Sequence, residues 1–139
     1  MLIFRLQEEV NMVRLENWNP PTLEYRKAIF TWDTEYAAQV HEGAGDNYPA
    51  RPWVDNAIAQ LDLEQEFSDG YREGEDLNKA FLHLTDMVSE QSLYELENPV
   101  YDWPRVTKRR SGDVVESPRD IYDLGNLYDS QSVKLEETL

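Results

Sequence analysis

Two stretches of the chain repeat apolar residues at the spacing of a helix. Val54, Ala57, Ile58 and Leu61 recur at i, i+3, i+4 and i+7, and this pattern predicts a helix over residues 53–67. The two glycines of 68–74 predict a break after it. Beyond the break, a longer apolar face predicts an amphipathic helix over 76–93 that Asp76 is suited to cap. The apolar positions of this second helix are Leu77, Ala80, Phe81, Leu84, Met87 and Val88.

Strand signals precede these helices. Residues 23–32 predict a strand, because strand-forming side chains alternate there and place Ala28, Phe30 and Trp32 on one face. The segment 2–18 fits both a helical and an alternating period, and of the two we favour the helix. Its last residues and those that follow, Asn-Trp-Asn-Pro-Pro at 17–21, predict a loop, since two prolines remove two backbone donors.

A short helix is predicted between the strand and the first long helix. Asp33 and Thr34 are suited to cap it, and it would span residues 34–42. Gly43 stands where a left-handed residue would end it. Pro52 then suits the first position of the helix that follows.

The C-terminal part of the chain predicts small elements. Strand formers at 106–110 and 114–115 flank a Ser-Gly turn and predict a hairpin. A single helical turn fits the spacing of Ile121, Leu124 and Leu127, and residues 133–135 predict a last short strand.

Together these elements predict one α+β domain over residues 1–139. We expect a small antiparallel or mixed β-sheet packed against two main amphipathic helices, with extended loops or termini. Within it, 1–22 forms an N-terminal segment, 23–97 a strand-helix core, and 98–139 a C-terminal segment open to exchange with a neighbouring subunit. A chain of 139 residues buries about 70% of its unfolded surface, which suffices for a core without disulfides.

The charge of the chain argues against a general nucleic-acid-binding surface. Thirteen Lys and Arg stand against 28 Asp and Glu, a formal net charge of −15. Affinity for DNA rests on basic side chains that displace counterions, so DNA should be repelled unless the cations cluster on one face. The chain has no cysteine, which excludes disulfides, thiol nucleophiles and thiolate metal sites. Its apolar runs fall far short of the ~18 residues of a membrane span, and we expect no membrane partner.

Signals for catalysis and metal binding are weak. His41 and Glu42, with Asp46 nearby, offer nitrogen and oxygen ligands, but neither an HExxH nor a His-x-His spacing is present, and we favour a solvated helix end. His83 is predicted to be an ordinary surface residue. The chain lacks a glycine-rich phosphate loop and a Gly-x-Ser-x-Gly elbow, and its carboxylates are too numerous for any one pair to be informative. We therefore expect neither enzyme activity nor a cofactor or metal.

One cluster of basic residues interrupts the acidic sequence. Arg105, Lys108, Arg109, Arg110 and Arg119 place five cations within fifteen positions. Two interpretations stay open, an ionic latch for an acidic neighbour and a solvated hairpin. The neighbour could be a copy of this chain or a phosphate backbone, and the abundance of carboxylates in the chain favours the protein partner.

Two parts of the sequence resemble motifs of a virus protein family. Residues 32–43, which contain Tyr-Ala-Ala-Gln-Val-His-Glu-Gly, and residues 48–53, Tyr-Pro-Ala-Arg-Pro-Trp, are similar to the Tyr-Ala-x-x-Val-x-x-Gly and Pro-Ala-Arg-Pro-Phe signature of tailed-phage minor tail, neck and tail-completion proteins. Residues 117–131 resemble the Arg-Asp-Ile-x-Asp-Thr-Gly-x-Leu-x-x-Ser motif of the same family, with Leu124 in place of its threonine. In the family this motif usually precedes the other, and here it follows.

The resemblance implies a structural subunit of a phage neck or upper tail. Copies would form a ring, expected to be hexameric, that joins head and tail and contacts adjoining neck and tail proteins. The chain would be assembled in the host cytoplasm and located in the virion. A channel wall dense in Asp and Glu would repel phosphate, so DNA would pass without specific binding. The residues that match the motifs form the expected interface: Tyr48, Pro49, Arg51, Pro52, Trp53, Arg119, Asp120, Asp123, Gly125 and Leu127.

The reversed order of the motifs carries a structural expectation of its own. In the usual order the strands next to the two motifs would be consecutive, so the resemblance implies that residues 133–135 pair with the strand at 23–32, within one subunit or across two. Pro49 and Pro52 would stiffen the entry to the following helix, and Arg51 is able to pair bidentately with a carboxylate.

Two other classes of function are weighed beside this one. The acidic surface could mimic DNA and inhibit a basic host protein, in which case the chain would be a monomer or dimer that competes with DNA. A metal-dependent hydrolase using His41, Glu42 and Asp46 would lose activity when these residues are changed to alanine, and we expect no such activity.

Overall fold

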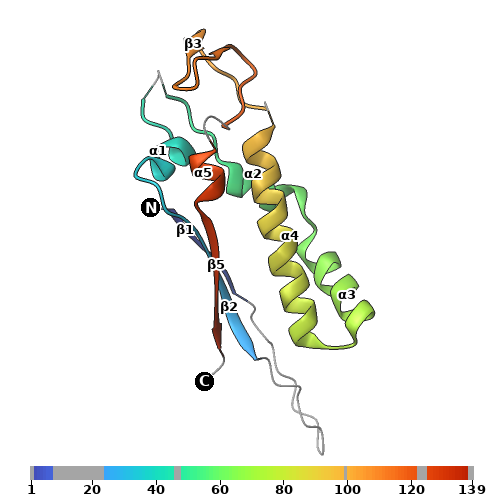
Figure 1. The fold of residues 1–139 in the computed structure, drawn as a ribbon. Coiled ribbons are helices and arrows are strands. Elements are labelled where there is room, and N and C mark those ends of the chain that lie inside the picture. The colour runs from blue at the N-terminus through green and yellow to red at the C-terminus, as the bar shows by residue number, and fades with distance from the viewer. Residues whose placement is uncertain (1, 8–23, 46–47, 99, 122–124, 138–139) are drawn as a thin grey trace, which may run out of the picture.

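A three-stranded antiparallel sheet backed by one long helix forms the frame of the chain. The computed structural model describes residues 2–7, 24–45, 48–98, 100–121 and 125–137. The sheet contains β1 (Leu2–Gln7), β2 (Tyr25–Trp32) and β5 (Gln131–Glu137) in the order β1-β2-β5. Helices pack on one face of this sheet, which confirms the predicted α+β class (Figure 1). The predicted loop at 17–21 lies outside the described residues.

The central strand β2 carries the apolar face that the sequence predicts. Ala28, Phe30 and Trp32 are buried, whereas Ile29 and Thr31, which alternate with them, are only half-buried. On β5 the cross-strand partners of the three buried residues are Leu135, Val133 and Gln131, in that order. This strand therefore supplies the centre of the core because it is covered on both edges and on one face.

The prediction of a helix at 2–18 is wrong for the part that the structure describes. Residues 2–7 form β1, which pairs antiparallel with β2, Leu2 opposite Trp32 and Phe4 opposite Phe30. The sequence of this segment fits both a helical and an alternating period. Pairing with β2, which has the alternating period, favours the strand.

The predicted helix at 53–67 is divided in two. Helix α2 (Trp53–Gln60) ends before Leu61, and α3 (Leu63–Gly74) begins after Asp62. The Asp62 carboxylate accepts a hydrogen bond of 3.1 Å from the backbone N–H of Gln65, which caps the new helix. The predicted break at 68–74 is likewise wrong, because these residues belong to α3.

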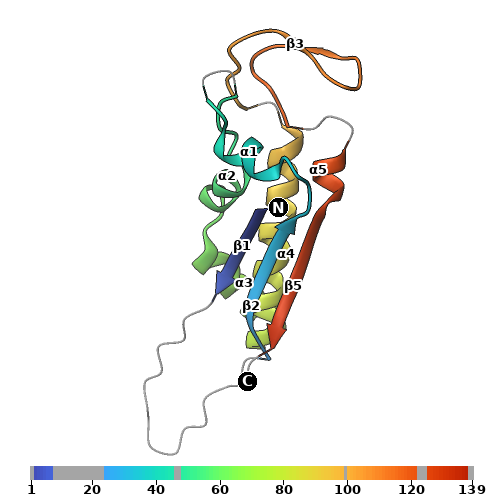
Figure 2. The same cartoon turned by 90° about the vertical axis from the view of Figure 1, so that its left-hand side faces the viewer.

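Helix α4 (Leu77–Glu97) confirms the predicted amphipathic helix and extends it by one turn. Asp76 caps it, accepting hydrogen bonds from the backbone N–H groups of Asn78 at 2.7 Å and Lys79 at 3.2 Å. Figures 1 and 2 show α4 running along the sheet, with α3 on the side of α4 away from the strands. The opposite face of the sheet carries no helix among the described residues.

His83, which was predicted to be an ordinary surface residue, lies between α3 and α4. His83 is half-buried, and its Nε2 lies 3.1 Å from Oε2 of Glu66 on α3. The histidine therefore links the two helices and is not an ordinary surface residue.

The remaining elements gather at one end of the molecule. Helix α1 (Ala37–Glu42), helix α5 (Asn126–Asp129) and a hairpin of β3 (Thr107–Lys108) and β4 (Val114–Val115) lie beyond the end of the sheet (Figure 1). The hairpin and the last strand confirm the sequence prediction, although Leu124 of the predicted helical turn lies outside the described residues. Strand β5 pairs with β2 of the same chain, as the motif order implied, and exchange with a neighbour stays a prediction.

Gly70 is predicted to be essential to the approach of α3 to α4. A Cβ atom at this position would lie 2.9 Å from Cβ of His83 and 3.1 Å from Cα of Ala80. We expect Gly70→Ala to lower the free energy of unfolding by about 1–3 kcal/mol, because the helices must separate. Urea denaturation measures the loss.

The matched control for this variant is Gly74→Ala in the same helix. There the three atoms nearest to an added Cβ all belong to the side chain of Lys79, and the closest, Cδ at 2.7 Å, can move aside. Alanine also has the higher helix propensity, so this variant should change stability by less than about 1 kcal/mol in either direction. Equal losses in the two variants would contradict the proposed role of Gly70.

Candidate functional site

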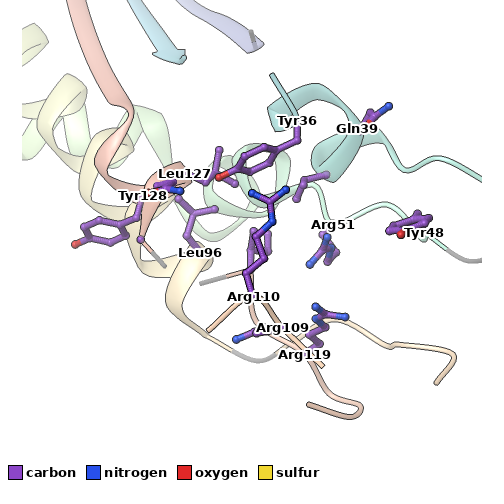
Figure 3. Close-up of a pocket in the computed structure, with 14 residues that line it drawn as sticks. Tyr36, Gln39, Tyr48, Arg51, Leu96, Arg109, Arg110, Arg119, Leu127 and Tyr128 are labelled. Carbon is purple, nitrogen blue, oxygen red and sulfur yellow. The ribbon is translucent and has the colours of Figure 1, made fainter. Parts of the chain in front are cut away.

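The two motif regions lie around one cavity. The cavity has a volume of about 420 Å³ and opens at the end of the sheet where α1, α5 and the hairpin meet (Figure 3). Tyr48 and Arg51 contribute from the first motif, and Arg119, Gly125 and Leu127 from the second. The structure thus brings together residues that the sequence separates by more than sixty positions.

A tight loop sets the position of Arg51. The backbone N–H of Arg51 donates to the carbonyl of Val40 at 2.9 Å, and that of Ala44 donates to the carbonyl of Tyr48 at 2.8 Å. Gly43 makes this return possible: its φ is 82°, and a Cβ there would lie 2.7 Å from the backbone nitrogen of Ala50. Gly43 ends α1 with a positive φ, as predicted, but it is the C-cap residue and its ψ of 166° lies outside the left-handed helical conformation.

Trp103 supports two of the arginines. The guanidinium carbon of Arg51 lies 4.6 Å from the centre of the indole ring, and that of Arg119 lies 4.3 Å from it. Tyr48 meets the same ring edge-on at 6.3 Å. Cations are attracted to the face of an indole ring, so this side chain reduces the cost of placing two positive charges together.

Arg109 and Arg119 are tied to the backbone and to neighbouring side chains. Arg109 forms a short ion pair with the Asp120 carboxylate and also donates to the Asp120 carbonyl at 2.9 Å. Arg119 donates to the Thr107 hydroxyl at 2.7 Å, which links it to β3. These contacts hold both guanidinium groups in place next to the cavity.

The five residues of the predicted basic cluster therefore fall into different surroundings. Arg109, Arg110 and Arg119 line the cavity, with the side chain of Arg109 buried and Arg110 exposed. Arg105 and Lys108 are exposed and are not among the lining residues. The interpretation as a solvated hairpin is thus wrong for Arg109, whereas Arg105, Lys108 and Arg110 are exposed.

Burial and like charge act together on Arg51. Its exposed fraction is 9%, and burial lowers the pKa of its guanidinium to about 10, with the charges of Arg119 and Arg109 adding to the effect. Among the described residues no carboxylate is hydrogen-bonded to Arg51, in contrast to the expected bidentate pair. Its Nε atom is buried without a hydrogen-bond partner in that part of the chain, a costly arrangement unless a ligand completes it.

Other predicted interface residues have different roles. Trp53 is fully buried and packs edge-to-face on Trp32, with ring centres 5.7 Å apart, so it belongs to the core. Pro49 lines an adjoining cavity of about 460 Å³, and Pro52 precedes the first residue of α2, one position before the expected one. Asp123 lies outside the described residues.

His41 differs from its predicted place at a solvated helix end. It is 5% exposed and packs edge-to-face against Trp53 with ring centres 5.0 Å apart. Burial lowers the pKa of its imidazole, and the carboxylates of Asp55 and Glu42 partly oppose this. Asp46 lies outside the described residues, and within those described no cluster of three or more His, Asp or Glu is placed to hold a metal ion.

Trp103 and Tyr101 are site residues that the sequence did not single out. The Tyr101 hydroxyl accepts a hydrogen bond of 3.1 Å from the Asn56 amide, and burial raises the pKa of Tyr101 to about 12. Both lie in the aromatic and basic stretch after residue 99, where periodicity is weak. That change of composition was the one available signal, because neither residue belongs to a motif.

Comparisons with known proteins add no assignment. No protein-family model, curated protein or solved structure matches this chain. Of the helices that the structure describes, none is long and apolar enough to cross a membrane.

We predict that the buried His41 makes stability depend on pH. Its folded pKa lies below the unfolded value of 6.5, so the unfolded state binds more protons, and stability falls as pH drops below about 6.5. His41→Phe keeps an aromatic ring against Trp53 and removes the titration. Chemical denaturation at about pH 7.5 and about pH 5.5 measures the stability of both proteins.

The difference between the two proteins isolates the histidine, because other groups titrate in both. We expect wild type to lose more free energy of unfolding than His41→Phe between these two pH values. An equal loss in both proteins would contradict the proposed effect.

Proposed function

We propose that this chain is a structural subunit of a phage neck or upper-tail ring, which joins head and tail and surrounds the DNA channel. The observation that carries the proposal is the pairing of β5 with β2, which places residues of both motifs around one cavity. In the family that this chain resembles, the two motifs occur in the opposite order along the sequence. A binding site depends on where residues lie in space, so the reversed order matters less than the closeness of the two motifs around the cavity.

The chemistry of the cavity also supports a binding role. Its described lining offers guanidinium, phenol and amide groups, which bind and orient an anion. A ring subunit must bind its neighbours through its contact surfaces, and groups of this kind allow such binding.

The net charge is consistent with a genome channel. At −15 the chain repels phosphate, and an acidic wall lets DNA move past without sticking. The proposed ring is hexameric, lies between other collars of the neck or tail, and binds neither a cofactor nor a membrane.

Localisation in virus particles tests this proposal. Purified particles of the virus that encodes the chain, carrying a C-terminal epitope tag on it, are labelled with gold-conjugated antibody and imaged by electron microscopy. We expect label at the head–tail junction and several copies of the chain per particle by quantitative mass spectrometry. Untagged particles are the control.

Two results would contradict the proposal. One is absence of the chain from purified particles. The other is a monomer that displaces DNA from a basic protein, which is the behaviour of a DNA mimic.

A further inference from the structure

The cavity at the end of the sheet is positively charged although the chain is strongly acidic. Arg51, Arg109, Arg110 and Arg119 line it, and no Asp or Glu occurs among its described lining residues (Figure 3). Arg109 is neutralised by Asp120, which leaves the cavity with a surplus of positive charge within that lining. A concave surface with one sign of charge concentrates ligands of the opposite sign.

Arg51 makes the cavity resemble a preorganised anion-binding site. Its side chain is more than nine-tenths buried, lies over Trp103, and has a buried Nε atom that bonds to none of the described residues. Placing a buried cation next to other arginines is unfavourable for folding. A carboxylate that entered from outside would relieve this cost and gain charge-assisted hydrogen bonds.

The chain itself presents a complementary surface on α3. Asp62, Glu66, Asp69 and Glu73 recur at i, i+4, i+7 and i+11, so they follow one side of the helix as an acidic stripe. Asp62 and Glu73 are exposed, and the Asp69 side chain is 46% exposed. Within the stripe Asp62 caps α3 and Glu66 bonds to His83, so Asp69 and Glu73 are the carboxylates that it can offer to a cavity.

The acidic stripe cannot enter the cavity of its own chain. Glu73 lies near the beginning of α4, whereas Leu96, near the end of α4, lines the cavity. At a rise of 1.5 Å per residue these two ends are roughly 28 Å apart along the helix, far beyond the reach of a glutamate side chain. Figures 1 and 2 likewise show α3 beside the lower part of the sheet and the hairpin at the other end.

We propose that the arginine-lined cavity receives carboxylates of the α3 acidic stripe from a second copy of this chain. The proposal deepens the ring function above and rests on it for its biological setting. The contact joins two different surfaces, so it is heterologous, and contacts of this kind close into rings when the rotation between copies allows it. The net negative charge of two copies opposes association only weakly at physiological salt, where the Debye length is about 8 Å and the local contact is closer than that.

Paired charge-reversal variants test the contact. Arg110→Glu damages the cavity at an exposed residue, and the double variant Asp69→Lys, Glu73→Lys damages the acidic stripe. Analytical ultracentrifugation over a range of concentrations and salt measures association. We expect wild type to associate and each variant alone to associate at least about tenfold more weakly.

Mixing the two variants gives the sharper result. The intact stripe of Arg110→Glu fits the intact cavity of the double variant, so a mixture should form a 1:1 pair that grows no further. A twofold-symmetric contact between the two variants would contain one pair of intact surfaces and one pair in which both surfaces carry reversed charge.

Controls of equal charge separate the contact from net charge. Arg105→Glu changes an exposed arginine outside the cavity, and Glu64→Lys, Glu75→Lys changes two acids outside the stripe. Both should associate like wild type, and circular dichroism should show all variants folded.

A wild type that stays monomeric at all concentrations, or a mixture that forms no pair, would overturn this inference. These results would not decide whether the chain is located in virus particles, because that is measured separately on purified virions. Association that persists in both charge-reversal variants would place the contact between copies elsewhere.

Discussion

The pairing of β5 with β2 determines where the C-terminal part of the chain lies. It brings together strands that end at residue 32 and begin at residue 131, which closes a loop of about a hundred residues. Closing such a loop costs roughly 4 kcal/mol of chain entropy. The buried face of β2 against α4 offsets this cost, and the closed loop contains all of the described residues that line the cavity. The pairing positions the end of the second motif, and its beginning is held by backbone hydrogen bonds of Arg119 with Tyr101 and of Ile121 with Leu96.

A second constraint concerns charge inside that loop. Three guanidinium groups lie close enough for their mutual repulsion and burial to lower the pKa of Arg51. Trp103, Asp120 and Thr107 each compensate part of the cost through contacts with one or two of these groups. A fold selected for stability alone has no need of such an arrangement, and removal of buried charges is often neutral or stabilising. Its presence points to a use outside the isolated chain.

Much of the fold could be predicted where a segment carries one dominant period. Strand β2 and helix α4 were predicted because burial on a single face makes their alternation and their 3.6-residue repeat unambiguous. Strand β1 was missed because its six residues fit both periods until a partner strand is present. The division between α2 and α3 was missed because no proline or glycine marks it. Asp62 followed by Gln65 was the available capping signal.

The site was predicted only in part, and the reason is physical. Arg51 and Arg119 stand in motifs, but their closeness depends on a long-range strand pairing that local patterns do not contain. His41 was placed in solvent because acidic residues, Glu42 and Asp46, are near it in the sequence, whereas its neighbour in space is Trp53.

The outer edge of β5 bears on how the protein avoids unwanted polymerisation. Lys134, Glu136 and Glu137 place three charges within this seven-residue strand, and Lys27 reaches Glu136 at 3.6 Å across the pair. Charged side chains on an edge strand discourage the addition of a foreign strand, the route by which exposed sheets grow into amyloid-like fibres. The charges on this edge therefore disfavour the joining of two copies through their sheets.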